Sequence, residues 1–176
     1  MDNKEIISDW FEKYGNDIYH FLIYRIGPVD AEDLLQEVFI KALRGFNSYQ
    51  EKSNPKTWLF SIARNVAVDE IRKRKVRKWM SHIPLENSKE PETTISPQSI
   101  LDHEEEHQTI YRAIKQLKSN YQDVIILRGI KELSIAETAD VLKWSKSKVR
   151  STQHRARIAL HEALRRCNDN EETRSE

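Results

Sequence analysis

Several features that define other classes of protein are scarce in this sequence. Its one cysteine, Cys167, excludes a disulfide within the chain and a thiolate metal cluster, which is typical of a reducing compartment. Four glycines and five prolines among 176 residues leave few tight turns and favour helix over sheet. The longest aliphatic run, at 124–127, is far too short to cross a membrane, and the N-terminus lacks a secretory signal pattern. We therefore expect a cytoplasmic protein.

The net charge is only +1, so the total charge of the chain identifies no partner. The charges are nevertheless separated along the sequence. Residues 71–78 and 143–157 each carry six Lys or Arg and no acid, whereas residues 86–106 carry seven acids and one Lys. This distribution indicates two basic surfaces joined by an acidic, solvated connector.

Apolar residues recur at helical spacing over most of the chain, and no segment shows the sustained alternation of a strand. Between 79 and 100 the helical pattern fails and three of the five prolines occur, which predicts a flexible linker. The predicted fold is all-α, with two small helical domains joined by that linker. The expected boundaries are 1–78 for the first domain, 79–100 for the linker, 101–167 for the second domain and 168–176 for a disordered tail.

Two helices near the C-terminus have the pattern of a helix-turn-helix. Ser134 and Glu137 form a capping box for the first helix, and Ser145 can cap the second. In this motif the second helix enters the major groove of DNA, where Arg and Ser side chains bond base edges. An ordinary hydrated surface helix is the alternative, and the capped helix before it favours DNA binding. The residues expected on the exposed face, opposite Val149, are Ser147, Lys148, Arg150, Ser151, His154 and Arg155.

Residues 31–44 predict a helix, capped by Asp30, with a wide apolar stripe and a polar face. Ile40 falls near the middle of the polar face, among Gln36, Glu37 and Lys41. Two interpretations remain open for it. Ile40 is either an ordinary exposed aliphatic side chain or the dry centre of a helix-docking site.

Aromatic side chains between 46 and 60 lie close in sequence to amide and basic groups. Such a combination binds single-stranded DNA, because bases stack on rings while cations hold phosphates. The alternative is that Phe46, Tyr49 and Phe60 pack into the core. Asn54 and Pro55 predict the start of a helix here, and Phe60 and Arg64 lie away from its apolar stripe.

Three segments taken in order resemble the bacterial RNA polymerase sigma factors of the sigma-70 family, in their short extracytoplasmic-function (ECF) form. The segments are "DAEDLLQEVFIKAL" at 30–43, "KTWLFSIARNVAVDEIRKRK" at 56–75 and "LSIAETADVLKWSKSKVRSTQHRARIAL" at 133–160. The resemblance covers roughly 5–165. It implies a protein without enzymatic activity or cofactor that binds core RNA polymerase and directs it to promoters for transcription initiation. It also implies an alternative sigma factor that responds to stress or to the state of the cell envelope.

The resemblance assigns roles to particular positions. The clamp helices of the largest polymerase subunit would be bound by Asp30, Asp33, Leu34, Gln36, Glu37, Ile40 and Lys41. The −10 element, as single-stranded DNA, would be bound by Tyr49, Lys52, Ser53, Asn54, Phe60, Arg64, Asn65 and Arg72, the first four around a flipped base. The helix-turn-helix would bind duplex DNA at the −35 element. The resemblance also implies an anti-sigma partner, which in this family is often anchored in the membrane.

Two positions depart from the family pattern. Lys143 stands in the turn where the family usually has glycine, so a side chain must adopt a left-handed backbone conformation there. Gln153 replaces an apolar residue on the second helix of the motif, which leaves its inward packing open.

Two other functions fit parts of the sequence. A repressor that binds a duplex operator without polymerase would need only the helix-turn-helix, and it leaves the segment at 30–43 unexplained. His103, Glu104 and His107 match the H-E-x-x-H pattern of zinc proteases. That chemistry needs a third ligand and a shielded cavity, whereas the flanking residues are mostly polar.

Overall fold

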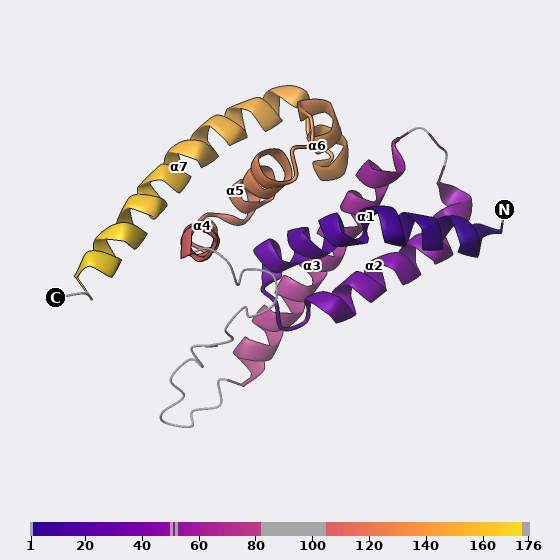
Figure 1. Ribbon diagram of the computed structural model, residues 1–176, viewed down its shortest axis with the longest axis horizontal. Coiled ribbons are helices and arrows are strands. Elements are labelled where there is room, and N and C mark those ends of the chain that lie inside the picture. The colour runs from indigo at the N-terminus through magenta and orange to yellow at the C-terminus, as the bar shows by residue number, and fades with distance from the viewer. Residues whose placement is uncertain (1, 50, 52, 82–104, 174–176) are drawn as a thin grey trace.

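The computed structural model describes residues 2–49, 51, 53–81 and 105–173, and all regular elements within them are helical. The described N-terminal part contains three long α-helices, and the described part after 82–104 contains four α-helices and the π-helix η2 (Figure 1). The elements are α1 (Asn3–Ile26), α2 (Ala31–Gly45), the short η1 (Phe46–Ser48), α3 (Pro55–Met80), α4 (Glu105–Lys115), α5 (Ser119–Val124), η2 (Ile125–Ile130), α6 (Ile135–Leu142) and α7 (Lys146–Glu172). The all-α prediction is confirmed.

Helices α1, α2 and α3 pack against one another as a three-helix unit. Its centre is apolar and fully buried, with the rings of Phe21 and Phe60 in edge-to-face contact at 5.7 Å between centroids. Burial of each such side chain contributes roughly 1.5–3 kcal/mol relative to exposure. Asn54 caps α3 as expected, since its side chain accepts a hydrogen bond from the Lys56 amide. Asp30 does not cap α2; its carboxylate accepts a bond from Arg74 at 2.8 Å instead.

In the C-terminal half, the long helix α7 packs along α4, α5 and α6 (Figure 1). α5 continues into η2, a wider turn of π-helix in which the Lys131 amide bonds the Ile126 carbonyl. The buried residues Ile114, Ile126, Val149 and Ala156 bring these helices together. No described helix is both long enough and apolar enough to cross a membrane.

Two helices end later than the sequence predicts. α3 continues through Met80, although the domain was expected to end at 78. α7 continues through Glu172, so residues 168–172 are helical, and the prediction of a disordered tail there is wrong. No glycine or proline follows Cys167 to stop the helix, and the Thr173 amide and hydroxyl bond the Asp169 carbonyl at its end. Most of the expected linker lies outside the described residues.

Candidate functional site

α6, the turn after it and α7 have the geometry of a helix-turn-helix, and capping bonds fix the start of each of the two helices. Ser134 Oγ accepts from the Glu137 amide at 3.1 Å, and the Glu137 carboxylate accepts from the Ser134 amide at 2.7 Å. Ser145 Oγ accepts from the Lys148 amide at 3.1 Å and so caps α7. Lys143 has φ 56° and ψ 42°, the left-handed conformation that the turn requires. The left-handed conformation costs a non-glycine residue on the order of 1 kcal/mol, but the chain still forms the turn with lysine at this position.

The face of α7 predicted to bind duplex DNA is exposed along its whole length. Val149 and Ala156 are fully buried against the domain, so their helix cannot rotate without loss of core contacts. Lys148 Nζ lies 4.3 Å from the centroid of the Trp144 ring, a cation–π contact that orients the first turn. The structure therefore brings the predicted residues together on one accessible surface: Ser147, Lys148, Arg150, Ser151, His154 and Arg155.

Gln153 packs against the domain through a hydrogen bond. Its Oε1 accepts from Arg128 Nε at 3.2 Å, and Arg128 also donates to the Leu133 carbonyl. An apolar residue at this position would leave the Arg128 guanidinium with one bond fewer. The glutamine thus connects α7 to the segment before α6, which holds the two helices of the motif at a fixed angle.

An aromatic cavity of about 630 Å³ lies between α1 and the start of α3. Three of the residues predicted around a flipped base, Tyr49, Ser53 and Asn54, line it, and Lys52 lies outside the described residues. The Tyr49 hydroxyl donates to the Ser53 carbonyl. Burial, together with the nearby charge of Glu51, raises the pKa of Tyr49, so this hydroxyl stays protonated.

The opposite wall of this cavity was not predicted from the sequence. Trp10, Lys13 and Tyr14 of α1 line it, and the Trp10 ring lies 5.4 Å from that of Tyr49, edge to face. Trp10 and Tyr14 recur at the spacing of core-facing residues on a helix. Periodicity alone therefore cannot distinguish a side chain that lines a cavity from one that packs in the core. The Glu51 carboxylate lines the cavity as well. Aromatic rings around a cavity of this size can hold a planar base.

The other residues expected at the −10 element lie along α3 and differ in accessibility. Asn65 and Arg72 are exposed, and Arg72 lies 3.7 Å from Asp69 at the surface. The side chain of Arg64 is 28% exposed and is bonded to Asp123 of α5 at 3.3 Å. Phe60 is fully buried, so in this arrangement it cannot touch DNA, contrary to the prediction.

The polar face of α2 is exposed, with Ile40 at its middle. Ile40 is 48% exposed, and Glu37 and Lys41 next to it form an ion pair at 3.0 Å. Asp33 and Gln36 are exposed on the same side. Leu34 is buried, because it shares the inward stripe with Val38 and Ala42, so the prediction that it contacts a partner is wrong for this conformation.

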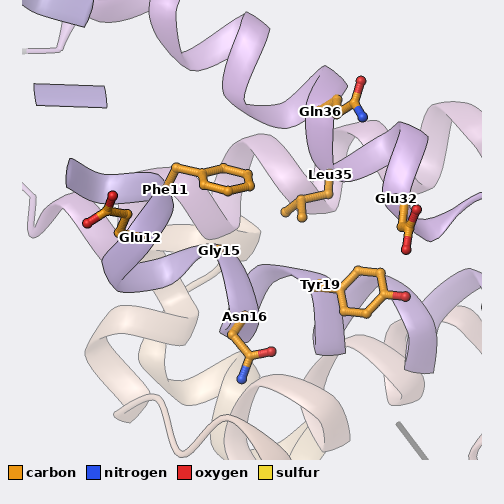
Figure 2. A pocket seen from close by; sticks show the side chains of 8 residues that line it. All are labelled: Phe11, Glu12, Gly15, Asn16, Tyr19, Glu32, Leu35 and Gln36. Carbon is orange, nitrogen blue, oxygen red and sulfur yellow. The ribbon is translucent and has the colours of Figure 1, made fainter. Parts of the chain in front are cut away.

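A groove of about 480 Å³ lies beside this face, between α1 and α2 (Figure 2). Phe11 and Leu35 point into it from the two helices, and Phe11 is 45% exposed. Gly15 forms part of its wall, where an added Cβ would lie 3.7 Å from the Phe11 ring. Gln36 lines the groove and also lies on the polar face of α2. The two surfaces are therefore continuous.

The zinc-protease pattern falls mainly on residues outside the described ones. His103 and Glu104 are among these, and His107 is exposed on α4. Within 2–49, 51, 53–81 and 105–173, no three His, Cys, Asp or Glu side chains are grouped as a metal site would need.

Comparison with known proteins identifies the family. Sigma-70 region 2 matches residues 10–77 and Sigma-70 region 4 matches residues 107–160. The ECF RNA polymerase sigma factor SigX of Bacillus subtilis (strain 168) is 36% identical over 157 residues, which cover 88% of this chain and 81% of that protein. The RNA polymerase sigma factor YlaC of the same organism is 33% identical over 172 residues, which cover 97% and 99%.

Among solved structures, the sigma factor RpoE in complex with the anti-sigma factor NepR from Bartonella quintana has a TM-score of 0.69 and 27% identity. The similarity covers 90% of this chain and 96% of that one. The two-part helical fold, the helix-turn-helix and these matches agree. The chain belongs to the ECF group of the sigma-70 family, the non-enzymatic factors that direct RNA polymerase to promoters.

Proposed function

We propose that three surfaces of this sigma factor have three separate roles. The exposed face of α2 docks on the clamp helices of core polymerase, the aromatic cavity takes an unpaired base of the −10 element, and α7 reads the −35 element. The observation that carries this proposal is the surface of α7. Six polar or basic side chains share one accessible face of a helix whose opposite stripe is locked in the core.

The geometry of α7 supports a base-reading role. Arg150 and Arg155 are exposed and separated by somewhat more than one helical turn, so both can reach into one major groove. An arginine can bond guanine through two hydrogen bonds, and Ser151 or His154 can act as donor or acceptor beside it. A bidentate contact contributes roughly 1–3 kcal/mol of discrimination between bases.

The cavity supports the role at the −10 element. Flipping a base out of a stack costs a few kcal/mol, and stacking on an aromatic side chain returns roughly 1–3 kcal/mol per base. Tyr49, Trp10 and Tyr14 supply rings, and Lys13 supplies a charge for the backbone. On this proposal α1 takes part in promoter opening, a role that the sequence pattern did not indicate.

The surface of α2 supports docking on polymerase. An exposed isoleucine surrounded by polar and charged side chains has the anatomy of an interface centre with a polar rim. We propose that the adjoining groove at Phe11 and Leu35 extends this interface onto α1. We also propose a role in an envelope or stress response, action in the cytoplasm, and an anti-sigma partner of the kind that NepR is for RpoE.

Transcription start mapping tests the function. The chain is mixed with core RNA polymerase from Bacillus subtilis and genomic DNA, and the 5′ ends of transcripts are sequenced. We expect new start sites that share a −35 and a −10 motif, and Arg150→Ala should relax base preference in the −35 motif alone. The matched control is Arg165→Ala, an exposed arginine farther along α7, which should leave the motifs unchanged. Identical start sites with core enzyme alone would refute the proposal.

A further inference from the structure

An acidic side chain lies in the cavity that is proposed to take an unpaired base. Glu51 lines this cavity together with Trp10, Tyr49 and Lys13. Lys13 Nζ lies 5.3 Å from the centroid of the Tyr14 ring. In the described part of the chain, no lysine or arginine forms an ion pair with Glu51. Its carboxylate is therefore available to a ligand, although a carboxylate repels the phosphates of DNA.

The backbone at Glu51 has a conformation that favours glycine. Its φ is 52°, in the left-handed region that a residue with a side chain rarely adopts. Glycine would adopt this conformation without strain, so the fold of the loop gains nothing from glutamate at this position. Strained backbone of this kind occurs most often at functional sites. The strained position and the unpaired charge together point to a binding role for the side chain.

The neighbouring polar groups determine what else the cavity offers to a ligand. The Tyr49 hydroxyl already donates to the Ser53 carbonyl, so toward a ligand it can only accept. Asn54 Oδ1 already accepts from the Lys56 amide at 2.9 Å, so the amino group of the Asn54 side chain remains to donate. The cavity therefore combines a charged acceptor at Glu51 with a donor at Asn54.

The Watson–Crick edges of the four bases match this combination unequally. Cytosine, adenine and guanine each carry an exocyclic amino group that can donate to a carboxylate, and each has an acceptor on the same edge for an amide donor. Thymine has no amino group, and its single N–H lies between two carbonyl oxygens, whose lone pairs a carboxylate repels. A hydrogen bond to an ionised group is also stronger than one between neutral groups, so the mismatch with thymine is costly.

We propose that Glu51 selects the base that enters this cavity. Its carboxylate accepts from the exocyclic amino group of cytosine, adenine or guanine and rejects thymine, while the Asn54 amide donates to the acceptor on the same edge. Entry of a base is part of the proposed function, on which this role of Glu51 rests. The repulsion of phosphates weakens binding of every DNA alike, whereas the bond to an amino group favours only some bases. The net effect of Glu51 is therefore discrimination between bases.

Binding of premelted promoters tests this selection. The holoenzyme is assembled from the full chain and core RNA polymerase, and a promoter identified by start mapping is prepared with an unpaired −10 element. Each unpaired position carries dC, dA, dG, dT or dU in turn, and dU has the edge of thymine without its methyl group. At one position we expect the three amino-bearing bases to bind about tenfold more tightly than dT and dU, the order of magnitude of one hydrogen bond to a charged group.

Glu51→Gln is the decisive variant, because the glutamine amide has the same shape and can donate to a carbonyl oxygen. It should reduce the ratio at that position from about tenfold to about twofold, mainly through tighter binding of dT and dU. Glu51→Gly, which suits the left-handed backbone, should reduce the ratio as well. The matched control is Asp9→Asn, which removes one negative charge from an exposed position of α1 next to Trp10 and should keep the tenfold ratio.

Tyr49→Ala separates the two ways in which the expectation can fail. If this variant weakens binding of all five bases at one position, the cavity holds a base, and an unchanged ratio in Glu51→Gln then overturns the role of Glu51 alone. A parent chain that binds dT at that position as tightly as the amino-bearing bases overturns it equally. If Tyr49→Ala changes binding at no position, the cavity takes no base, and both the proposed function of the cavity and the role of Glu51 are refuted.

Discussion

Thr138 gives a sharp test of the packing at the helix-turn-helix. Its side chain on α6 is fully buried, and its Oγ1 is the single buried side-chain polar atom without a hydrogen-bond partner among the described residues. A buried unsatisfied hydroxyl costs about 1–3 kcal/mol. Valine has the same branched shape and a similar helix propensity. Thr138→Val should therefore raise the free energy of unfolding by about 1–2 kcal/mol.

In a chain of this length, such a gain corresponds to a rise in melting temperature of about 2–8 °C. Urea denaturation followed by circular dichroism measures it, and an unchanged m-value shows that the unfolded state is the same. Two variants on α6 calibrate the result. Thr138→Ser keeps the hydroxyl and loses one buried methyl, at a cost of about 1 kcal/mol. Ser134→Ala loses the cap, at a cost of about 0.5–2 kcal/mol. A Thr138→Val protein no more stable than the parent would mean that a water molecule bonds the hydroxyl, and the reasoning would fail.

Three further predictions address the two surfaces and the domain contact. Ile40→Asp combined with Glu37→Lys should abolish co-elution with core polymerase while the circular dichroism spectrum stays unchanged; normal co-elution would remove α2 as the docking face. Arg150→Ala or Arg155→Ala should weaken use of the consensus −35 element by about 1–3 kcal/mol if the contact is bidentate, and a variant that still prefers consensus over −35-mutated promoters as strongly as the parent would contradict it. Burial, with the charges of Arg25 and Arg74, lowers the pKa of Lys115 from 10.5 to about 7. Between these values the unfolded chain binds more protons than the folded one, so stability should rise from pH 7 to pH 9, and Lys115→Met should flatten that slope.

The local chemistry of the helix-turn-helix could be predicted because its determinants are close together in sequence. Ser134 and Glu137 are three residues apart and bond each other as expected. Ser145 caps α7, and Lys143 adopts the left-handed backbone conformation that was expected in the turn. The exposed face of α7 follows from helical periodicity once Val149 is assigned to the core.

Contacts between distant segments could not be predicted in this way. Asp123 precedes an aliphatic run. From the sequence alone, a carboxylate at this position cannot be distinguished from an ordinary polar residue of a short helix. Its partners lie 98 and 59 residues earlier in the chain, so no local pattern indicates them. Phe60 was placed away from the apolar stripe of its helix, whereas it packs against Phe21 of α1 inside the N-terminal unit. Trp10 was not predicted to line the aromatic cavity. Residues that line a cavity and residues that pack in the core recur at the same helical spacing.

The contact between the two domains combines apolar packing with buried charges. Buried apolar residues of both domains form one cluster, and α6 packs against α3. Apolar burial contributes about 25 cal/mol per Å². The ion pair of Asp123 with Arg25 fixes one geometry but adds little net stability, because desolvation of both charges offsets most of their attraction. The apolar packing therefore supplies most of the stability of this contact, and the buried charges supply its specificity.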